Sequence, residues 1–432
     1  MTNYQSFSRR RILGGGLVAS LLLSSPASAQ AYPLEPDFDI AVASEMKPQT
    51  IDLPGPTGRY ELGTTELHLV DPARTDAAAP GGKRELMVSV WYPARPEGEI
   101  ARYMPAKTAA AVDKNLSESI GAPLGTFDFA KSQTHAHLDA PARPGKHPVV
   151  LFSPGYPSSR FLNTAQVEEL ASQGYVVVTI DHTHEGPVEF PGGRFVPSTV
   201  NPEPTADQYR QVIDTRVADT RFVLDQIIRL AYGTNPDADE RKLPAGLPKA
   251  IDLRKIGMYG FSAGGFTTAA TLYADRRVAA GADLDGTLAY DRVNGPLSEV
   301  ARRGLDRPFL LFGSDGSQRT KPGENHERSW AEFWQAQQGW KLNLQLPGSR
   351  PLAFSDYQFI YYDVVSKLLG DDDEMNVADQ IQANIAGVVD RRRSVAAQRA
   401  YLTAFFDQTL RHEPQALLRT ESPDYPEVTF VR

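Results

Sequence analysis

The stretch "KIGMYGFSAGGFTTAA", residues 255–270, decides the expected fold of this chain. It begins with apolar residues typical of a buried strand, passes a serine flanked by glycines, and ends in small residues suited to a helix. Gly260-Phe261-Ser262-Ala263-Gly264 matches the pattern G-x-S-x-G in the strand–turn–helix context that this pattern requires. A serine at such a turn is a candidate nucleophile, and it needs a base to take its proton.

Apolar runs with strand character recur along the chain, and helical patterns separate the later ones. The later runs are almost continuously apolar, which is typical of strands covered on both faces, as in a parallel sheet. Strands that alternate with helices predict a doubly wound, mostly parallel α/β sheet. The expected strands lie at 64–70, 85–93, 148–155, 174–182, 255–262, 278–286, 308–316 and 340–348, and the clearest helices at 161–174, 205–230 and 394–412.

Two stretches, 96–146 and 350–392, interrupt this alternation and are expected to form cap or lid insertions over one end of the sheet. Within the second, "QFIYYDVVSKLL" (358–369) could be an exposed lid or an amphipathic helix packed on the core, and the packed helix is the favoured interpretation. We expect one domain over residues 59–432, preceded by a Pro-rich arm at 30–58.

Residues 1–29 have the features of an export signal. A basic segment (Arg9–Arg11) precedes a short apolar stretch and an A-x-A end at Ala27-Ser28-Ala29. The serine before the double arginine resembles a bacterial twin-arginine signal, and a general secretory signal is the alternative. Either signal predicts a mature protein outside the cytoplasm, in the periplasm or the medium.

The composition excludes several classes of function. The 432 residues contain no cysteine, which excludes thiol catalysis and thiolate metal sites. The formal net charge is −8, and removing residues 1–29 takes away three arginines and no acidic residue, so that it becomes −11. Nucleic-acid binding, which needs a basic face, is therefore not expected. The 41% hydrophobic content is ordinary for a globular protein, and no stable membrane anchor is predicted.

A second part of an acyl-transfer site lies in "VVLFSPGYPSS" (149–159). Such a site needs donors for the negative charge that develops on the substrate oxygen. The Pro-Gly turn after this strand resembles the first oxyanion loop of α/β-hydrolases. The expected donors are the backbone N–H groups of Tyr156 and of Ala263, the latter at the start of the helix after the serine. A plain turn at 154–157 is the other interpretation.

The acid of the triad follows the serine along the chain in this fold, and the histidine comes last. The next strand, "VAAGADLDG", ends at Asp283 and Asp285, which share one face of the strand. Asp285 lies nearer the carboxyl end, where the chemistry is expected, and is the preferred acid. Asp315, after "PFLLFGS", is the rival.

"PVVLFSPG", "GYVVVTIDH", "GMYGFSAGG" and "AGADLDG", in this order and spacing, resemble the type II platelet-activating factor acetylhydrolase family. "RELMVSVWYPA" (84–94) also resembles the exported bacterial lipase- and esterase-like members of that family, and the likeness covers most of residues 55–425. The resemblance implies calcium-independent serine esterase activity on short or oxidised acyl chains, lipids and simple esters. It implies no cofactor and places the triad acid at Asp285.

Chain order restricts the base. Only His326 and His412 follow Asp285, whereas the remaining histidines precede Ser262: His68, His135, His137, His147, His182 and His184. In the resembled family the histidine stands a few residues after a Gly-Ser pair, in the loop that follows the last core strand and ahead of an "FSD"-like segment. In this chain's "LPGSRPLAFSD" the matching position is Pro351.

Three explanations of this departure stay open. His326, in "GENHERSW", serves as base from the preceding connection on the same edge of the sheet. Alternatively, His182 or His184 of "IDHTHEG" reaches the serine. Otherwise acyl transfer is impaired, because loss of a triad histidine costs ~10⁶ in turnover.

Other histidines have weaker functional interpretations. His182 and His184 share a face and could form a metal pair, but the chain offers no clear third and fourth ligands, so no metal site is predicted. His135 and His137 are expected in a loop near the entrance of the site.

The sequence thus predicts an exported serine ester hydrolase of carboxylesterase or lipase type that acts on a small-molecule ester or lipid. The site residues are Ser262, Asp285 and His326, with Tyr156 and Ala263 as the oxyanion hole. The alternative is a catalytically impaired or non-catalytic ester- or lipid-binding relative. The sequence does not indicate the oligomeric state.

Overall fold

A computed structural model describes residues 47–79, 81–120, 122–291, 295–315, 328–369 and 377–431. In these residues an 11-stranded sheet has the strand order β13-β12-β11-β10-β9-β5-β6-β2-β1-β4-β3. The strands are β1 (Leu62–Thr75), β2 (Lys83–Pro93), β3 (Ile100–Arg102), β4 (Gln133–Leu138), β5 (His147–Ser153), β6 (Val176–Ile180), β9 (Ile251–Phe261), β10 (Ala280–Leu284), β11 (Phe309–Ser314), β12 (Lys341–Leu346) and β13 (Thr429–Phe430). Strands β7 (Val188–Phe190) and β8 (Arg194–Val196) form a separate hairpin.

The helices follow the predicted alternation. They are α1 (Ala106–Ile120), α2 (Thr164–Ser172), α3 (Ala206–Ala231), α4 (Leu247–Ala250), α5 (Ala263–Ala274), α6 (Glu299–Arg303), α7 (Ser329–Ala336), α8 (Tyr357–Leu369), α9 (Val377–Ile385) and α10 (Arg391–Phe406). Short helical turns are η2 (Pro191–Gly193), η3 (Pro351–Phe354), η5 (Asp407–Arg411) and η6 (Ala416–Leu418). A capping box between Thr205 and Gln208 begins α3, which explains why the long helix starts there.

The centre of the sheet is parallel, as predicted. Strand β5 pairs in parallel with both β6 and β9, and the parallel pairing continues through β10, β11 and β12. Strands β1 and β2 pair antiparallel with each other, and β2 pairs antiparallel with β6. Parallel strands place all their carboxyl ends at one edge, so the loops after them converge there.

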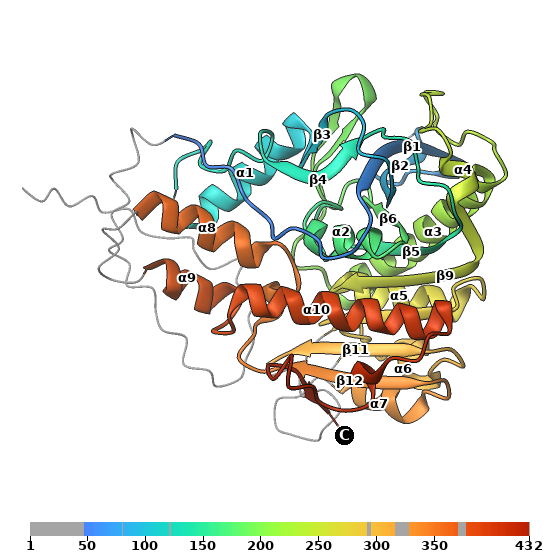
Figure 1. The fold of residues 1–432 in the computed structure, drawn as a ribbon, viewed down its shortest axis with the longest axis vertical. Coiled ribbons are helices and arrows are strands. Elements are labelled where there is room, and N and C mark those ends of the chain that lie inside the picture. The colour runs from blue at the N-terminus through green and yellow to red at the C-terminus, as the bar shows by residue number, and fades with distance from the viewer. Residues whose placement is uncertain are drawn as a thin grey trace, which may run out of the picture.

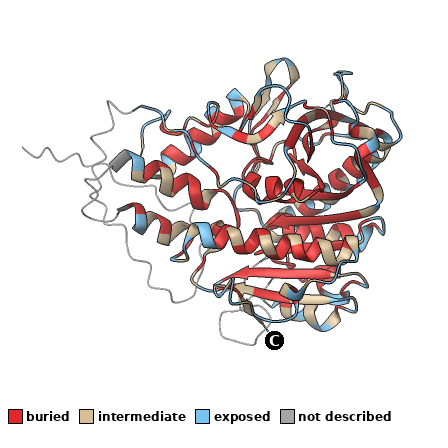
Figure 2. Cartoon of the chain, viewed as in Figure 1, coloured by how far each residue is buried: buried red, intermediate tan, exposed pale blue. Residues whose placement is uncertain are grey.

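Side chains of these strands alternate between two cores. On β5, Val149 and Leu151 point to the core shared with α3 and α5, whereas Val150 and Phe152 point to the core shared with α2 and α10. Figure 1 shows α10 lying across one face of the sheet, and Figure 2 shows the strands buried almost throughout. Burial on both faces explains why the sequence of these strands is continuously apolar.

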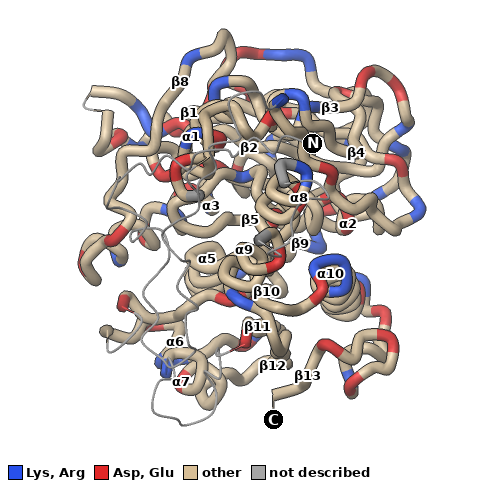
Figure 3. Tube along the Cα trace, turned by 90° about the vertical axis from the view of Figure 1, so that its left-hand side faces the viewer, with Lys and Arg blue, Asp and Glu red and all other residues tan. Residues whose placement is uncertain are grey.

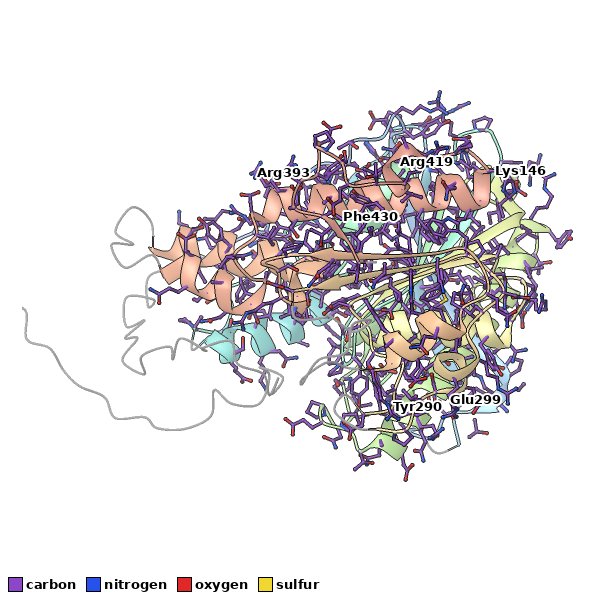
Figure 4. All side chains as sticks on the ribbon, turned by 90° about the horizontal axis from the view of Figure 1, so that it is seen from below. Lys146, Tyr290, Glu299, Arg393, Arg419 and Phe430 are labelled. Atoms are coloured by element: carbon purple, nitrogen blue, oxygen red, sulfur yellow. The ribbon has the colours of Figure 1, made fainter. Side chains whose placement is uncertain are left out.

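Figure 4, seen along the sheet, separates these two faces. Arg393 and Arg419 lie on the side of α10, and Tyr290 and Glu299 lie on the opposite side, near α6 and α7. Figure 3 shows acidic and basic residues interspersed over the surface in that view.

The segment 96–146 is partly built into the sheet. The sequence predicts an interruption of the strand–helix alternation here, but β4 pairs in parallel with β1, and β3 pairs antiparallel with β4. The rest of this segment forms α1. Figure 1 shows α1, α8 and α9 on the side toward which the arrowheads of β11 and β12 point, that is, beyond the carboxyl ends of the strands. A lid at this edge remains a prediction.

The two interrupting segments share one apolar cluster. It joins Phe127 and Phe129 of the first segment to Phe359 and Ile360 of α8, and these side chains are buried. The helix that contains 358–369 is therefore packed on a core, as the favoured interpretation had it, and is not an exposed apolar lid.

Asp356, at the end of the "FSD" segment, ties this cluster to the sheet. Its carboxylate accepts hydrogen bonds from the backbone N–H groups of Thr164 (2.7 Å) and Ala165 (3.2 Å) at the start of α2. It also accepts one from the hydroxyl of Tyr103 (2.9 Å). Burial raises the pKa of Asp356 to about 7. The aspartate thus joins three parts of the chain that are distant in sequence.

The predicted arm is described from residue 47 onward. Ile51 and Leu53 are buried, and Arg399 of α10 donates hydrogen bonds to the carbonyl oxygens of Pro54 (2.7 Å) and Gly55 (3.0 Å). The rest of the arm and the whole predicted export signal lie outside the described residues. No described helix combines the length and apolar character needed to cross a bilayer.

Candidate active site

Ser262 occupies a sharp turn between β9 and α5. Its backbone has φ 54° and ψ −119°, a conformation that non-glycine residues rarely adopt and that costs about 1–3 kcal/mol. Its backbone N–H donates to the carbonyl oxygen of Leu284 at the end of β10 (2.8 Å), and its side chain does not cap the helix. The strained turn holds a half-buried serine at the carboxyl edge of the sheet.

The glycines of the motif are required by close backbone contacts. A Cβ atom on Gly260 would lie 2.2 Å from the carbonyl carbon of Gly264, and one on Gly264 would lie 1.8 Å from the carbonyl oxygen of Ser153. A Cβ atom on Gly265 would lie 1.7 Å from Asp283 Oδ1. Only glycine lets α5 approach β5 and β10 closely enough to form this turn.

Asp285 lies directly after β10, next to the serine turn. Its backbone also has a positive φ (57°), and its side chain is buried. Oδ1 accepts hydrogen bonds from the backbone N–H (2.8 Å) and the hydroxyl (2.9 Å) of Ser314 at the end of β11. The neighbouring Gly286 packs against Ser262, because a Cβ atom there would lie 2.4 Å from the serine carbonyl oxygen.

The other two carboxylates considered in the sequence have different surroundings. Asp283 lies in β10, two residues before Asp285, and is buried. It accepts hydrogen bonds from the Gly286 N–H (2.7 Å) and from Trp330 Nε1 (3.2 Å). Asp315 is exposed and accepts a hydrogen bond from the Gly348 N–H (3.0 Å) in the loop after β12. These contacts make Asp283 a packing residue and Asp315 a link between two loops.

The loop after β5 lies against the serine turn. A Cβ atom on Gly155 would lie 3.1 Å from Phe261 Cδ1 and 3.7 Å from Ser262 Cβ. Tyr156 follows directly, and Ala263 is the first residue of α5, so its N–H has no carbonyl partner one turn earlier. The two predicted oxyanion donors therefore belong to two segments that meet at Ser262.

His182 has a complete set of partners away from Ser262. Its Nε2 lies 2.9 Å from Ser153 Oγ, and its Nδ1 lies 3.1 Å from Asp219 Oδ2. All three residues are buried, and burial lowers the pKa of His182. His184 lies 3.2 Å from Asp76 through Nε2. These contacts use both ring nitrogens of His182 and one of His184.

The remaining described histidines lie elsewhere. His135 and His137 are in β4 and not in a loop, which corrects the prediction, and His135 Nδ1 lies 2.7 Å from the buried carboxylate of Glu168. His412 follows Arg411, whose guanidinium donates to the carbonyl of Gly174 just before β6 (3.1 Å). His412 is therefore at the amino ends of the strands, opposite the serine.

The position that matches the family histidine begins the short helix η3. Pro351 stands in the loop after β12, where Ser349 accepts a backbone hydrogen bond from Asp315 (3.1 Å). This loop is thus at the carboxyl edge, as the sequence predicted. The other candidate base, His326, lies outside the described residues.

A buried ionic network below the loop after β5 was not found from the sequence. Arg216 of α3 donates to the carbonyls of Pro154 and Gly155 and pairs with Glu185. A strongly amphipathic helix gives no signal that one arginine on it is fully buried. Among the described residues, no group of three or more His, Asp or Glu side chains could hold a metal ion.

Aromatic side chains form a row beside the serine turn. The ring of Tyr156 lies 6.2 Å from that of Tyr209 on α3, which lies 6.2 Å from that of Phe266, one turn after Ser262. The ring of Phe266 lies 5.3 Å from that of Tyr290, in the connection after β10. The tyrosines are half-buried, so the row borders the surface.

Comparison with known proteins identifies relatives along most of the chain. A family model described as "Platelet-activating factor acetylhydrolase, isoform II" matches residues 47–188. A protein of Arthroderma benhamiae named "Probable 1-alkyl-2-acetylglycerophosphocholine esterase" is 29% identical over 90% of this chain and 96% of its own length. A "Platelet-activating factor acetylhydrolase" of Cavia porcellus is 23% identical over 67% of this chain and 66% of its own length.

A solved structure is also similar over nearly the whole chain. The ferulic acid esterase from Streptomyces cinnamoneus aligns with a TM-score of 0.68 and 35% sequence identity, and the alignment covers 89% of this chain and 99% of that one. The strand order and this neighbour define the class of the protein as an α/β-hydrolase. Within that class, the chain belongs to the platelet-activating factor acetylhydrolase-like esterase family, whose members are hydrolases that act on esters.

Proposed function

We propose that this chain is an exported serine ester hydrolase in which Ser262 is the nucleophile. The observation that carries the proposal is the strained serine turn, against which Gly155 of the loop after β5 and Gly286, the residue after Asp285, both pack closely. A nucleophile elbow needs this combination, because the hydroxyl must stand clear of its own backbone while oxyanion donors and acid converge on it.

In the proposed reaction, a base removes the proton from Ser262 Oγ as this oxygen attacks the carbonyl carbon of the ester. The negative charge that forms on the carbonyl oxygen is held by the N–H groups of Tyr156 and Ala263. The tetrahedral intermediate collapses, and the alcohol leaves with the proton from the base. Water, deprotonated by the same base, then attacks the acyl-enzyme, releasing the carboxylic acid and restoring the serine.

We assign Asp285 the role of orienting the base, and His326 that of the base itself. Asp285 is supported by its place directly after β10 and by the two Ser314 donors, which fix the position of its carboxylate. His326 is supported by chain order and by the placement of the other candidates: His182 is bound to Ser153 and Asp219, and His412 lies at the opposite edge.

The substrate is proposed to be a small ester or lipid with a short acyl chain or an aromatic acyl group. A relative is named for an acetyl ester of a glycerophospholipid, and the solved neighbour is named for ferulic acid, an aromatic acid. In the aromatic row beside the serine turn, Phe266 is fully buried, and the half-buried rings of Tyr156, Tyr209 and Tyr290 border the surface. Aromatic pairs of this kind contribute ~0.5–1.5 kcal/mol beyond area burial, which favours the aromatic acyl group.

One panel of variants tests the mechanism. Hydrolysis of p-nitrophenyl acetate, p-nitrophenyl butyrate and methyl ferulate is measured for the parent, Ser262→Ala, His326→Ala and Pro351→His. We expect Ser262→Ala and His326→Ala each to lose at least about 10³-fold in kcat. Parent activity equal to that of Ser262→Ala would exclude the serine mechanism, and full activity in His326→Ala would exclude His326 as base.

The second candidate function is that of a non-catalytic ester- or lipid-binding relative. Pro351, at the position where the resembled family has its histidine, is the specific observation that favours it. On this reading the parent is inactive, and Pro351→His creates a large rate that a second change, Ser262→Ala, removes. A fall in activity in Pro351→His would instead show that hydrolysis does not need a histidine at position 351.

A further inference from the structure

We propose that Arg216, paired with Glu185, is a positioning residue that sets the direction of the Tyr156 N–H, one of the two proposed oxyanion donors; this inference rests on the proposed function. Arg216 lies on α3, and Glu185 lies in the connection after β6. Neither touches Ser262. Both are buried, and the side chain of Arg216 has no exposed surface.

The Arg216 guanidinium donates to this loop and to Glu185, and Nη1 also lies 3.5 Å from Ser153 Oγ at the end of β5. Nη1 donates to the carbonyl oxygen of Pro154 (2.7 Å), and Nη2 donates to that of Gly155 (2.9 Å). Nε donates to both oxygens of Glu185 (3.0 and 2.9 Å), and Nη2 also contacts Glu185 Oε2. The planar fork therefore holds two consecutive carbonyls and a carboxylate in one fixed geometry, whereas an ammonium group is a rotatable point charge with three donors.

The geometry of the peptide bond transmits this to the active site. In a planar trans peptide, the C=O and the following N–H point in opposite directions. The Pro154 carbonyl belongs to the same peptide group as the Gly155 N–H, and the Gly155 carbonyl to the same group as the Tyr156 N–H. Because Arg216 draws both carbonyls inward, it turns both N–H groups to the other side of the loop.

The loop itself packs against the serine turn. The Cα of Gly155 is so close to the turn that an added Cβ would lie 3.7 Å from Ser262 Cβ. The start of α5 presses on the same loop, since a Cβ on Gly264 would lie 2.8 Å from the Pro154 carbonyl oxygen. Both α5 and Arg216 thus approach the Pro154 carbonyl oxygen, which leaves this peptide group little room for another orientation.

Charge explains the presence of Glu185. A fully buried guanidinium with only carbonyl partners would carry a large desolvation penalty. Glu185 neutralises this charge and, through its contacts with Nε and Nη2, sets the rotation of the guanidinium plane. The pair therefore keeps an arginine under the oxyanion loop in one orientation before substrate binds, and such preorganisation is what a site for developing charge requires.

The test compares Arg216→Lys and Arg216→Met with Arg84→Lys. Arg84 is the matched control: it is buried, pairs with Asp219 and Asp76, and donates to a backbone carbonyl (Thr183, 2.9 Å) outside the oxyanion loop. We expect Arg216→Lys to lower kcat by about 10–100-fold with KM changed less than about twofold, because the change affects the transition state. Arg216→Met is expected to lose more.

A tetrahedral analogue gives a second readout. Phenylboronic acid forms a tetrahedral adduct with a serine Oγ, so its inhibition constant should rise in Arg216→Lys by about the same factor as kcat/KM falls. Arg84→Lys, compared per folded molecule, should leave both quantities within about threefold of the parent. Equal effects of the two lysine variants, or a change in KM alone, would overturn the proposal.

Hydrogen exchange keeps this test separate from the proposed function. If the parent has no Ser262-dependent activity, the serine mechanism fails. The hold of Arg216 on the loop after β5 can still be measured in the same protein. Exchange of the peptide that covers residues 154–161 should be at least about tenfold faster in Arg216→Lys than in Arg84→Lys. Identical exchange in the two variants would show that Arg216 does not hold the loop.

Discussion

Ser153 ends β5 and Ser262 follows β9, the neighbouring strand, yet the surroundings of the two serines are opposite. Ser153 has a histidine at 2.9 Å whose other ring nitrogen lies 3.1 Å from an aspartate, so its hydrogen-bonded relay is complete. All members of this relay are buried. Ser262 is half-buried on a turn with positive φ, at the carboxyl edge of the sheet.

A serine that is hydrogen-bonded to a histidine and, through it, to an aspartate is therefore not necessarily a nucleophile. The Ser153–His182–Asp219 relay has the order of groups found in a catalytic triad, but no substrate carbonyl can reach a serine with no exposed surface. Ser262 is accessible and lies on a strained turn, and the two segments that hold the proposed oxyanion donors meet beside it. We therefore interpret Ser153 as a structural residue and Ser262 as the nucleophile. The following experiments test this distinction.

The largest expected effect concerns labelling by a fluorophosphonate. The parent and Ser153→Ala should be labelled at residue 262, whereas Ser262→Ala should show a labelling rate lower by at least about 10³-fold. Mass spectrometry of the labelled peptide identifies the serine. A label on Ser153, or a Ser153→Ala variant that folds but is not labelled, would reverse the interpretation of the two serines.

The next effect separates two aspartates on one strand. Asp285→Asn should lower kcat by up to about 10⁴-fold while the protein stays folded, because a neutral amide cannot orient and stabilise the protonated base. Asp283→Asn places an amide N–H₂ against one of the two donors, Gly286 N–H or Trp330 Nε1, which bind different oxygens of the carboxylate. It should cost about 1–3 kcal/mol of stability with activity per folded molecule nearly kept. Kinetics and urea unfolding of both variants check the pair; the opposite pattern would make Asp283 the acid.

A stability effect tests the structural role of the relay. Asp219 is fully buried; burial alone would raise its pKa, but Arg84 and His182 lower the pKa well below its usual value. Asp219→Ala leaves Arg84 without this partner and should cost about 3–5 kcal/mol. Asp225→Ala, on the same helix, removes only an exposed pair with Arg277 and should cost less than about 1 kcal/mol. Urea unfolding compares them, and equal costs would contradict the assignment.

The smallest effect is a pH dependence. Burial lowers the pKa of His182, so this ring stays neutral in the folded protein. In the unfolded chain the same ring takes up a proton as the pH falls below about 6.5. Below that pH the unfolded state binds more protons, and stability falls as the pH falls. His182→Gln should remove a slope of up to about 1.4 kcal/mol per pH unit between pH 6.5 and pH 5. Urea unfolding across this range checks it; an unchanged slope would mean that His182 is charged when folded.

Much of the fold could be predicted from the sequence because the central strands are buried on both faces and read as apolar runs. Strands β5, β9, β10 and β11 lie within one to four residues of their expected bounds. Strands β3 and β4, at one end of the sheet, were not predicted, because they are short and the buried positions of β4 hold Thr134 and Ala136, which are not strongly apolar. His135 and His137 were assigned to a loop for the same reason.

The candidate site was predictable where local geometry demands a particular residue type. Glycine at 260 and 264 is required by close backbone contacts, so the G-x-S-x-G pattern predicts the turn between strand and helix. The roles of Ser262, Asp285 and the oxyanion residues remain predictions that the variants above test. His326 lies outside the described residues.

The sequence by itself determined the parallel sheet, the serine turn and the order of serine and acid along the chain, because each depends on local pattern and spacing. The tertiary structure alone decided which buried polar groups meet. His182 pairs with Ser153 and Asp219, and Arg216 holds the Pro154 and Gly155 carbonyls, through contacts between residues 29–62 positions apart. Burial forces such groups to find partners, but which partner lies within reach depends on how the strands and helices pack.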